Sequence, residues 1–200
     1  TYNGLSGDDF GCRLSDPGFL FDTKGSCIFA DTEDQLLELS ALLNSKVSQF
    51  LLNILCPTLD YSMVGVKKLP AILLKESIET VKKAKSIAEV DWNTSELARG
   101  FQSLPYCSSA NESLNSAWLN WVSVCNDNRQ QLQRLEEENN SLFISAYNLN
   151  GELSPEVPDD QITLVRADRE KDSQRLISYA IGCMMGRYSL DEPGLIYAHA

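Results

Sequence analysis

The chain has 200 residues, of which 43% are hydrophobic and 22% are charged. This composition is typical of a soluble globular protein and allows one domain or two small ones. The net charge of −11 argues against a general nucleic-acid-binding domain, which would be basic overall. No apolar run reaches the roughly 18–20 residues that span a bilayer, and the first residues do not lead us to expect a signal peptide.

Charge is distributed unevenly along the chain. Residues 66–85 contain six lysines and two glutamates, a local charge of +4. Residues 91–200 contain sixteen acidic and eight basic residues. A contact with a polyanion such as DNA is therefore expected in the first part of the chain and not in the second.

The six cysteines are scattered without a CxxC pair, and the single histidine is His199. Zinc sites usually combine paired cysteines with histidine. We therefore expect buried free thiols in a reducing cytoplasm rather than a metal site. The chain begins with Thr1 and not with Met, so we expect a processed chain or a piece of a longer protein.

The start of the chain predicts little regular structure. Residues 1–16 are polar and glycine-rich and are expected to form a loop or the tail of a structure that lies outside this chain. In residues 18–30, GFLFDTKGSCIFA, apolar residues flank a Thr-Lys-Gly turn, which predicts a β-hairpin. An extended surface loop is the alternative.

Two helices and a strand segment are predicted next. Thr32 and Gln35 have the spacing of a capping box and open the first helix. Ser45 is a candidate cap for a second amphipathic helix, which must end before Pro57. Residues 61–73 are predicted to form one or two short strands.

Three further helices are predicted, over residues 75–92, 112–149 and 168–190. The polar run at 126–131 is a candidate interruption of the second one. Its Trp118 and Trp121 are typical of a core, with stacking on a nucleobase as the alternative. The carboxylate clusters at 136–138 and 159–160 are expected to be solvated rather than catalytic.

The final helix is predicted to carry six apolar residues into the core: Leu176, Ile177, Ala180, Ile181, Met184 and Met185. Gly182 and Gly186 have the spacing of small residues at a close helix–helix contact, here expected in a soluble core. Lys67 and Lys68 are candidates for a phosphate contact; the alternative is a solubilising charge at a sheet edge.

The sequence lacks the common catalytic motifs. The eleven glycines form no phosphate-binding loop, and there is no GxSxG elbow. With one histidine at the end of the chain, no Ser-His or Cys-His pair is plausible. A small standalone enzyme is therefore disfavoured.

Several stretches, in order, resemble one family. They are residues 18–30, 40–72 (SALLNSKVSQFLLNILCPTLDYSMVGVKKLPAI), 134–164 (RLEEENNSLFISAYNLNGELSPEVPDDQITL) and 175–198 (RLISYAIGCMMGRYSLDEPGLIYA). Together they are similar to the PglX-type adenine-specific DNA methyltransferases of BREX phage-defence systems. The chain departs from the family where Cys56-Pro57-Thr58 replaces Asn-Pro-Thr and YSMVGVKK replaces a piece like FQVGDI.

The resemblance implies methyl transfer from S-adenosylmethionine to N6 of a flipped adenine by the parent protein. Such enzymes use a glycine-containing strand–turn–helix and an Asn-Pro-Pro-aromatic tetrapeptide, and this chain has neither motif. We therefore expect no catalytic residue, cofactor site or metal in it. The recognition-like stretches provide four candidate DNA contacts, which are Lys24, Lys46, Lys67 and Lys68.

The predicted fold is α+β and mainly α, with a target-recognition-like unit over 1–74 and a helical scaffold over 75–200. The predicted function is a non-catalytic segment of an N6-adenine-specific methyltransferase that contributes to DNA recognition and interdomain scaffolding. Expected partners are double-stranded DNA, the catalytic domain of the same parent chain and other defence proteins, without a membrane. The alternative is a helical docking module for defence-system partners or phage inhibitors.

Overall fold

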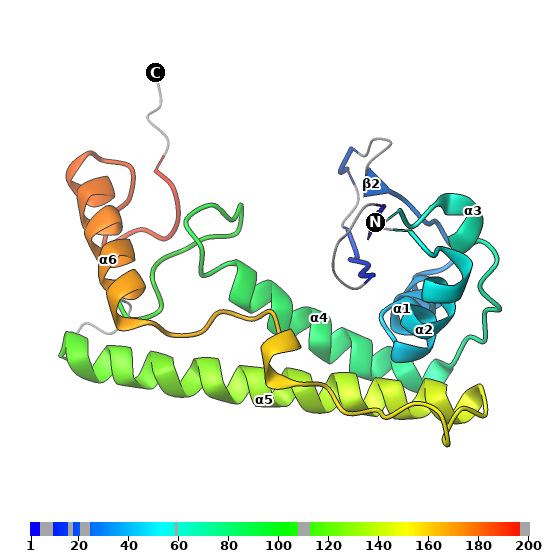
Figure 1. Ribbon diagram of the computed structural model, residues 1–200. Helices are drawn as coiled ribbons and strands as arrows, with labels where there is room; N and C mark the ends of the chain where they lie inside the picture. The colour runs from blue at the N-terminus through cyan, green and yellow to red at the C-terminus, as the bar shows by residue number, and fades with distance from the viewer. Residues whose placement is uncertain (5–9, 16–17, 21–24, 59, 108–112, 197–200) are drawn as a thin grey trace. The chain divides into compact units, whose positions relative to one another are not determined.

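The computed structural model describes residues 1–4, 10–15, 18–20, 25–58, 60–107 and 113–196 (Figure 1). Its elements are β1 (Tyr2–Asn3), β2 (Gly25–Ser26), α1 (Glu33–Leu43), α2 (Lys46–Leu55), α3 (Met63–Val66), the 3-10 helix η1 (Lys75–Ser77), α4 (Ile78–Trp92), α5 (Leu114–Ala146), the 3-10 helix η2 (Asp159–Gln161) and α6 (Arg169–Met184). The predicted α+β, mainly α class is confirmed.

The chain packs as two compact units. Unit 1 comprises Thr1–Lys85 and Gln133–Pro158, and unit 2 comprises Ser86–Leu132 and Asp159–Ala200. Each unit thus draws on two stretches of sequence, and α4 and α5 contribute residues to both. The predicted division into 1–74 and 75–200 stays a prediction.

The two predicted helix caps in unit 1 are confirmed. The Thr32 hydroxyl accepts a hydrogen bond from the Gln35 backbone N–H at 3.2 Å, and α1 follows. The Ser45 hydroxyl accepts from the Ser48 N–H at 3.3 Å and opens α2. Each cap satisfies a backbone donor that has no partner within its helix, which explains why the boundaries could be predicted locally.

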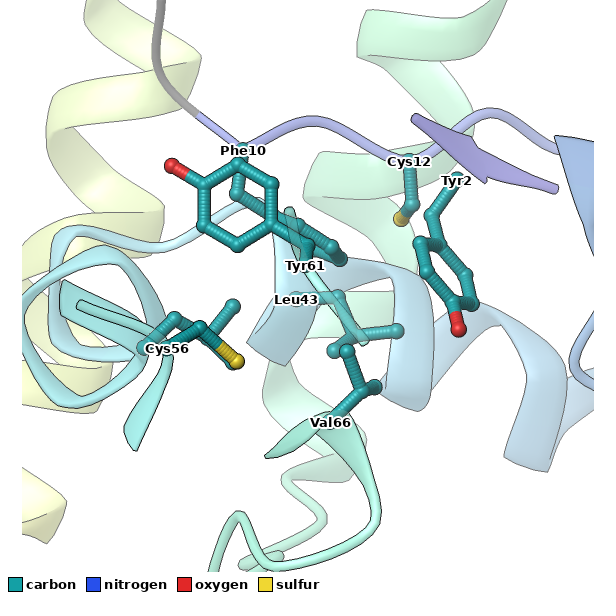
Figure 2. Packing of buried hydrophobic residues seen from close by; sticks show 8 residues of the cluster. Tyr2, Phe10, Cys12, Leu43, Cys56, Tyr61 and Val66 are labelled. Atoms are coloured by element: carbon teal, nitrogen blue, oxygen red, sulfur yellow. The ribbon is translucent and has the colours of Figure 1, made fainter. Parts of the chain in front are cut away.

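The start of the chain forms a strand, β1, where a loop was predicted. β1 pairs with β2 in an antiparallel ladder, with Tyr2 opposite Ser26. The predicted hairpin within 18–30 is therefore wrong in its strand partner, and its residues 21–24 lie outside the described part. Tyr2 and Phe10 enter a core with Tyr61, in which the Phe10 and Tyr61 rings meet edge to face at 5.1 Å (Figure 2). Burial of these aromatic rings explains why a polar, glycine-rich segment is held in place.

The C-terminal end of α5 anchors the rest of unit 1. Phe143 and Ile144 pack with Ala41, Leu42 and Val47 of α1 and α2. The Asn139 side chain donates to the Ala41 carbonyl at 2.9 Å. A second core therefore joins residues about a hundred positions apart in the sequence.

α5 runs without interruption through 126–131, so the candidate break is absent. Cys125 and Leu132 are both buried and lie two turns apart, so the apolar side of the helix continues across the polar run. The helix ends at Ala146, and the φ of 62° at Asn148 allows the N–H groups of Asn148 and Leu149 to bond the Ser145 and Ile144 carbonyls. This is a Schellman end with asparagine in the position that usually favours glycine.

Unit 2 has its own core. Trp121 is buried there with Phe101, Tyr179 and Tyr188, and Trp118 packs against it. The prediction that the two tryptophans belong to a core is therefore confirmed.

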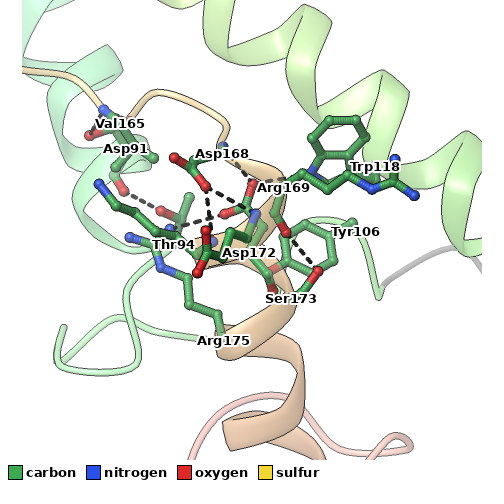
Figure 3. Close-up of polar contacts among 12 residues, drawn as sticks. Asp91, Thr94, Tyr106, Trp118, Val165, Asp168, Arg169, Asp172, Ser173 and Arg175 are labelled. Carbon is green, nitrogen blue, oxygen red and sulfur yellow. Dashed lines mark hydrogen bonds and ion pairs between the residues drawn. The ribbon is translucent and has the colours of Figure 1, made fainter.

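Asp172 of α6 is the polar centre of unit 2 (Figure 3). It is 2% exposed, and its Oδ2 accepts from the Trp118 indole N–H and the Asp168 backbone N–H, each at 3.1 Å. Its Oδ1 lies 3.5 Å from Arg175, and its backbone carbonyl accepts from the Tyr106 hydroxyl at 2.8 Å. The buried carboxylate of Asp172 thus connects α5 to the start of α6, and its backbone carbonyl connects α6 to the loop between α4 and α5.

The final helix differs from its prediction in three respects. It ends at Met184, where Gly186 with φ of 74° closes a Schellman motif through the Gly186 and Arg187 N–H groups. Gly182 contacts the ring of Tyr188, which follows the helix, and not a second helix. Ile177, Ala180, Ile181, Met184 and Met185, predicted to be core residues, are exposed, and Leu176 alone of the six packs against the core.

Candidate nucleic-acid interface

The two adjacent candidate lysines lie at the end of α3. The strand predicted for this segment is wrong, because the Ser62 hydroxyl accepts from the Gly65 N–H at 3.2 Å and starts a helical turn. The Lys67 N–H then donates to the Met63 carbonyl at 3.0 Å, and the Lys68 N–H to the Gly65 carbonyl at 3.0 Å. The β-forming residues around Gly65 made the helical turn hard to recognise in the sequence.

α3 is fixed by its buried side. Val66 packs in the core of Tyr2, Phe10 and Tyr61 (Figure 2). Gly65 is buried against Cys56, and a Cβ there would lie 2.1 Å from the Cys56 Sγ. Only glycine fits this approach, so α3 and the end of α2 form one packed corner.

The opposite side of α3 faces solvent. Lys67 and Lys68 are exposed. Met63 and Val64, which are 56% and 65% exposed, come from the same turn. The surface therefore combines two cations with two apolar side chains, which is a combination that suits phosphate oxygens and the apolar parts of nucleotides.

The segment after α3 is held by Tyr147 of unit 1. The Tyr147 hydroxyl donates to the Pro70 carbonyl and accepts from the Ile72 N–H, the latter at 3.2 Å. Burial raises the pKa of this hydroxyl, so it keeps its proton and its role as a donor at neutral pH. The position of Lys67 and Lys68 thus depends on the packing of Gly65 and Val66 before them and on the Tyr147 hydrogen bonds to Pro70 and Ile72 after them.

The other two candidate lysines differ from this pair. Lys46 begins α2, is half-buried, and its ammonium group donates to the Glu156 carbonyl. Its backbone N–H donates to the Asn140 side chain at 2.9 Å. Lys46 is therefore engaged within unit 1, and Lys24 lies outside the described residues.

Four lysines that were not selected as candidate contacts are also exposed in unit 1: Lys75, Lys82, Lys83 and Lys85. Lys82 lies 3.6 Å from Glu79 in an exposed pair, which water screens strongly. The basic composition of 66–85 was the signal for these residues, but composition alone does not tell which side of α4 is exposed.

The acidic clusters behave differently from one another. Asp159 is exposed and bound to Arg129 and Arg166, and the Arg166 hydrogen bond contributes most to lowering its pKa. The prediction that the cluster at 136–138 is solvated is wrong for Glu136 and Glu137. Glu137 accepts from the Val157 N–H at 3.1 Å, and burial raises the pKa of Glu136 to about 7 despite the nearby Arg13.

Within the described ranges, no group of three His, Cys, Asp or Glu side chains is arranged to hold a metal ion. No described helix is long and apolar enough to cross a membrane. The strands of the described part are the two-residue β1 and β2, which do not form the strand–turn–helix that the resemblance associates with S-adenosylmethionine.

Comparison with known proteins identifies relatives along the whole chain. No family model matches it. It is 37% identical over 206 residues to the adenine-specific methyltransferase PglX of Lacticaseibacillus casei (strain Zhang), and 30% identical over 219 residues to the adenine-specific methyltransferase BrxX of Escherichia coli O9:H4 (strain HS). These alignments cover 99% and 100% of the chain but only 17% and 18% of the two curated relatives. The predicted resemblance is therefore confirmed, and the chain is homologous from end to end to one segment of PglX-type proteins.

Proposed function

We propose that the chain is a non-catalytic segment of an N6-adenine-specific DNA methyltransferase of the BREX type, acting in the bacterial cytoplasm in phage defence. Its role is to contribute phosphate contacts to DNA recognition and to act as a scaffold between domains. The observation that carries the proposal is the end-to-end homology to two proteins named adenine-specific methyltransferases.

The surface at α3 supports the DNA-binding part of this role. Lys67 and Lys68 are exposed on a turn whose other side is packed in a core, so they are presented to a ligand on a rigid base. Rigid presentation lowers the entropic cost of binding a phosphate. Lys46 contributes less in this proposal because the Glu156 carbonyl already binds its ammonium group.

The long helices support the scaffold part. α5 spans 33 residues and contributes to both compact units. Its contacts with α1 and with Asp172 of α6 are specific hydrogen bonds as well as apolar packing. Methyl transfer and binding of S-adenosylmethionine are assigned to other parts of the parent protein.

A second candidate function is protein docking, which the acidic charge also favours. The specific observation behind it is the exposed apolar side of α6. Docking and DNA binding use different units and are therefore compatible in one protein.

The first test is fluorescence anisotropy of the full chain with a short DNA duplex at two salt concentrations. We expect salt-dependent binding, and the double variant K67E/K68E should weaken it and reduce the salt slope by roughly one for each phosphate that the protein no longer neutralises. The control R99E/K171E makes the same change in net charge at exposed positions of unit 2 and should bind like the wild type. Equal weakening by both variants would indicate non-specific electrostatics and contradict a site at α3.

A further inference from the structure

α6 presents an apolar side to solvent. Ile177, Ile181, Met184 and Met185 are 50–87% exposed, and their spacing places them along one side of the helix. Tyr179 on another side is buried in the core of unit 2. Solvent-facing positions of a helix are normally polar. The apolar residues on this side are therefore expected to pack against another apolar surface.

A shallow groove of about 430 Å³ follows this side of α6. Its lining includes Ile177, Ile181, Gly182, Met185 and Arg187. Arg187 is exposed and forms no ion pair with any carboxylate of the described residues. The groove is therefore mainly apolar, with Gln174 and Ser178 as neutral polar residues in its lining, and it carries a positive charge near the end of the helix.

We propose that this groove is a docking surface for another segment of the same polypeptide, lying outside these 200 residues, that is apolar and places a carboxylate opposite Arg187. This inference rests on the proposed function, in which the chain is part of a longer methyltransferase. In the two curated relatives, more than four-fifths of the sequence lies outside the aligned segment, so such proteins contain ample chain to cover the groove.

The size of the surface favours a segment of the same chain over a second molecule. A stable complex between separate proteins buries about 800 Å² on each partner. The exposed stretch from Ile177 to Met185 is only about 13 Å long at the rise of an α-helix, and it is too short to supply that area. A segment of the same polypeptide has an effective concentration of about a millimolar, so a small apolar contact is enough.

The three methionines of the chain provide a direct test. Met185 lines the groove, and Met184 is exposed next to it on the same apolar side of α6. Met63, which is 56% exposed on α3, is an internal reference. The 200-residue chain and the full-length polypeptide that contains it are treated with hydrogen peroxide, and methionine sulfoxide is quantified by mass spectrometry. We expect similar rates for all three in the 200-residue chain, and at least about tenfold slower oxidation of Met184 and Met185, relative to Met63, in the full-length protein.

A variant pair makes the assignment specific. I181D in the full-length protein should return the oxidation of Met184 and Met185 to the rate seen in the 200-residue chain, because a carboxylate disrupts an apolar contact. L190D makes the same kind of change at an exposed residue beyond the groove and should leave the methionines protected. Equal rates in both proteins would overturn the proposal. So would protection in the 200-residue chain that rises with its concentration, since a second copy would then cover the groove. DNA binding is measured separately, so its failure leaves this readout unchanged.

Discussion

Glu136 is a carboxyl group whose surroundings favour its neutral form. Burial raises its pKa from 4.5 to about 7, and the Arg13 guanidinium offsets this only in part. The folded pKa is higher than the unfolded one, so the folded state binds the additional proton between about pH 4.5 and pH 7. The contribution of Glu136 to stability is therefore greatest at low pH and is lost as the pH rises through 7.

This linkage predicts the effect of E136Q. The variant removes the ionisation, so at pH 8 it should be more stable than the wild type by up to about 3 kcal/mol, with a much smaller difference at pH 5. Urea unfolding at pH 5, 6, 7 and 8 measures the difference. E138Q, at an exposed position on the same helix, serves as the control and should follow the wild type at every pH. A pH-independent difference for E136Q would show that the neutral form is not favoured.

Asp172 is the residue on which unit 2 most depends for its polar contacts. D172A leaves the Trp118 indole N–H and the Asp168 N–H without their acceptor and Arg175 without its carboxylate. We expect a decrease of about 3 kcal/mol in the free energy of unfolding, and a smaller decrease for D172N, which keeps an oxygen acceptor. Urea unfolding followed by tryptophan fluorescence measures both variants. E170A, an exposed acidic residue of the same helix, should change stability by less than about 0.5 kcal/mol, and an equal decrease there would contradict the role of burial.

At the scale of elements, the helix caps could be predicted from the sequence, but the side of a helix that is buried could not. Thr32 and Ser45 were predictable as caps because a cap involves a side chain and a backbone N–H only three residues away. α6 has apolar residues on more than one side, with Tyr179 in the core and Ile181 in solvent. Helical periodicity finds both sides but does not tell which one packs, because that depends on Phe101 and Tyr188, which are distant in sequence or beyond the helix.

The same limit applies to the candidate site. The pair Lys67 and Lys68 was found from charge, and the structure places both in solvent. The turn that presents them was missed because its cause, the close approach of Gly65 to Cys56, is a tertiary contact. Lys46 was selected on the same grounds, but its partner Glu156 is 110 residues away in the sequence.

Gly182 provides a test of packing at the end of α6. A Cβ there would lie 2.6 Å from the Tyr188 ring, and that ring stacks on Tyr179 with centroids 5.0 Å apart. Helix propensity alone predicts that G182A stabilises the protein by about 1 kcal/mol. We expect the opposite, a destabilisation of about 1–3 kcal/mol, because the buried ring has no space to move. Thermal unfolding decides the sign, and G151A, where no atom lies within 4 Å of the added Cβ, is the neutral control.

At the scale of the whole molecule, the basic residues and the exposed apolar residues lie in different stretches, for which we propose different roles. The basic stretch 66–85 lies in unit 1, whereas the exposed apolar side of α6 belongs to unit 2. In the proposed function, neither stretch carries out methyl transfer. The proposed division of labour therefore leaves the cofactor to the rest of a PglX-type protein.

This division predicts that S-adenosylmethionine does not bind the 200-residue chain. The strands among the described residues are two residues long and antiparallel, so they offer no glycine-containing strand–turn–helix against which the cofactor could lie. Isothermal titration calorimetry of the chain should give no heat beyond dilution, while an adenine-specific DNA methyltransferase of known activity, titrated in parallel, gives a binding isotherm. A micromolar site in the chain would mean that it contributes to the cofactor pocket and would contradict its assignment as a non-catalytic segment. In that case K67E/K68E should leave cofactor binding unchanged while it weakens DNA binding, which would separate the two sites.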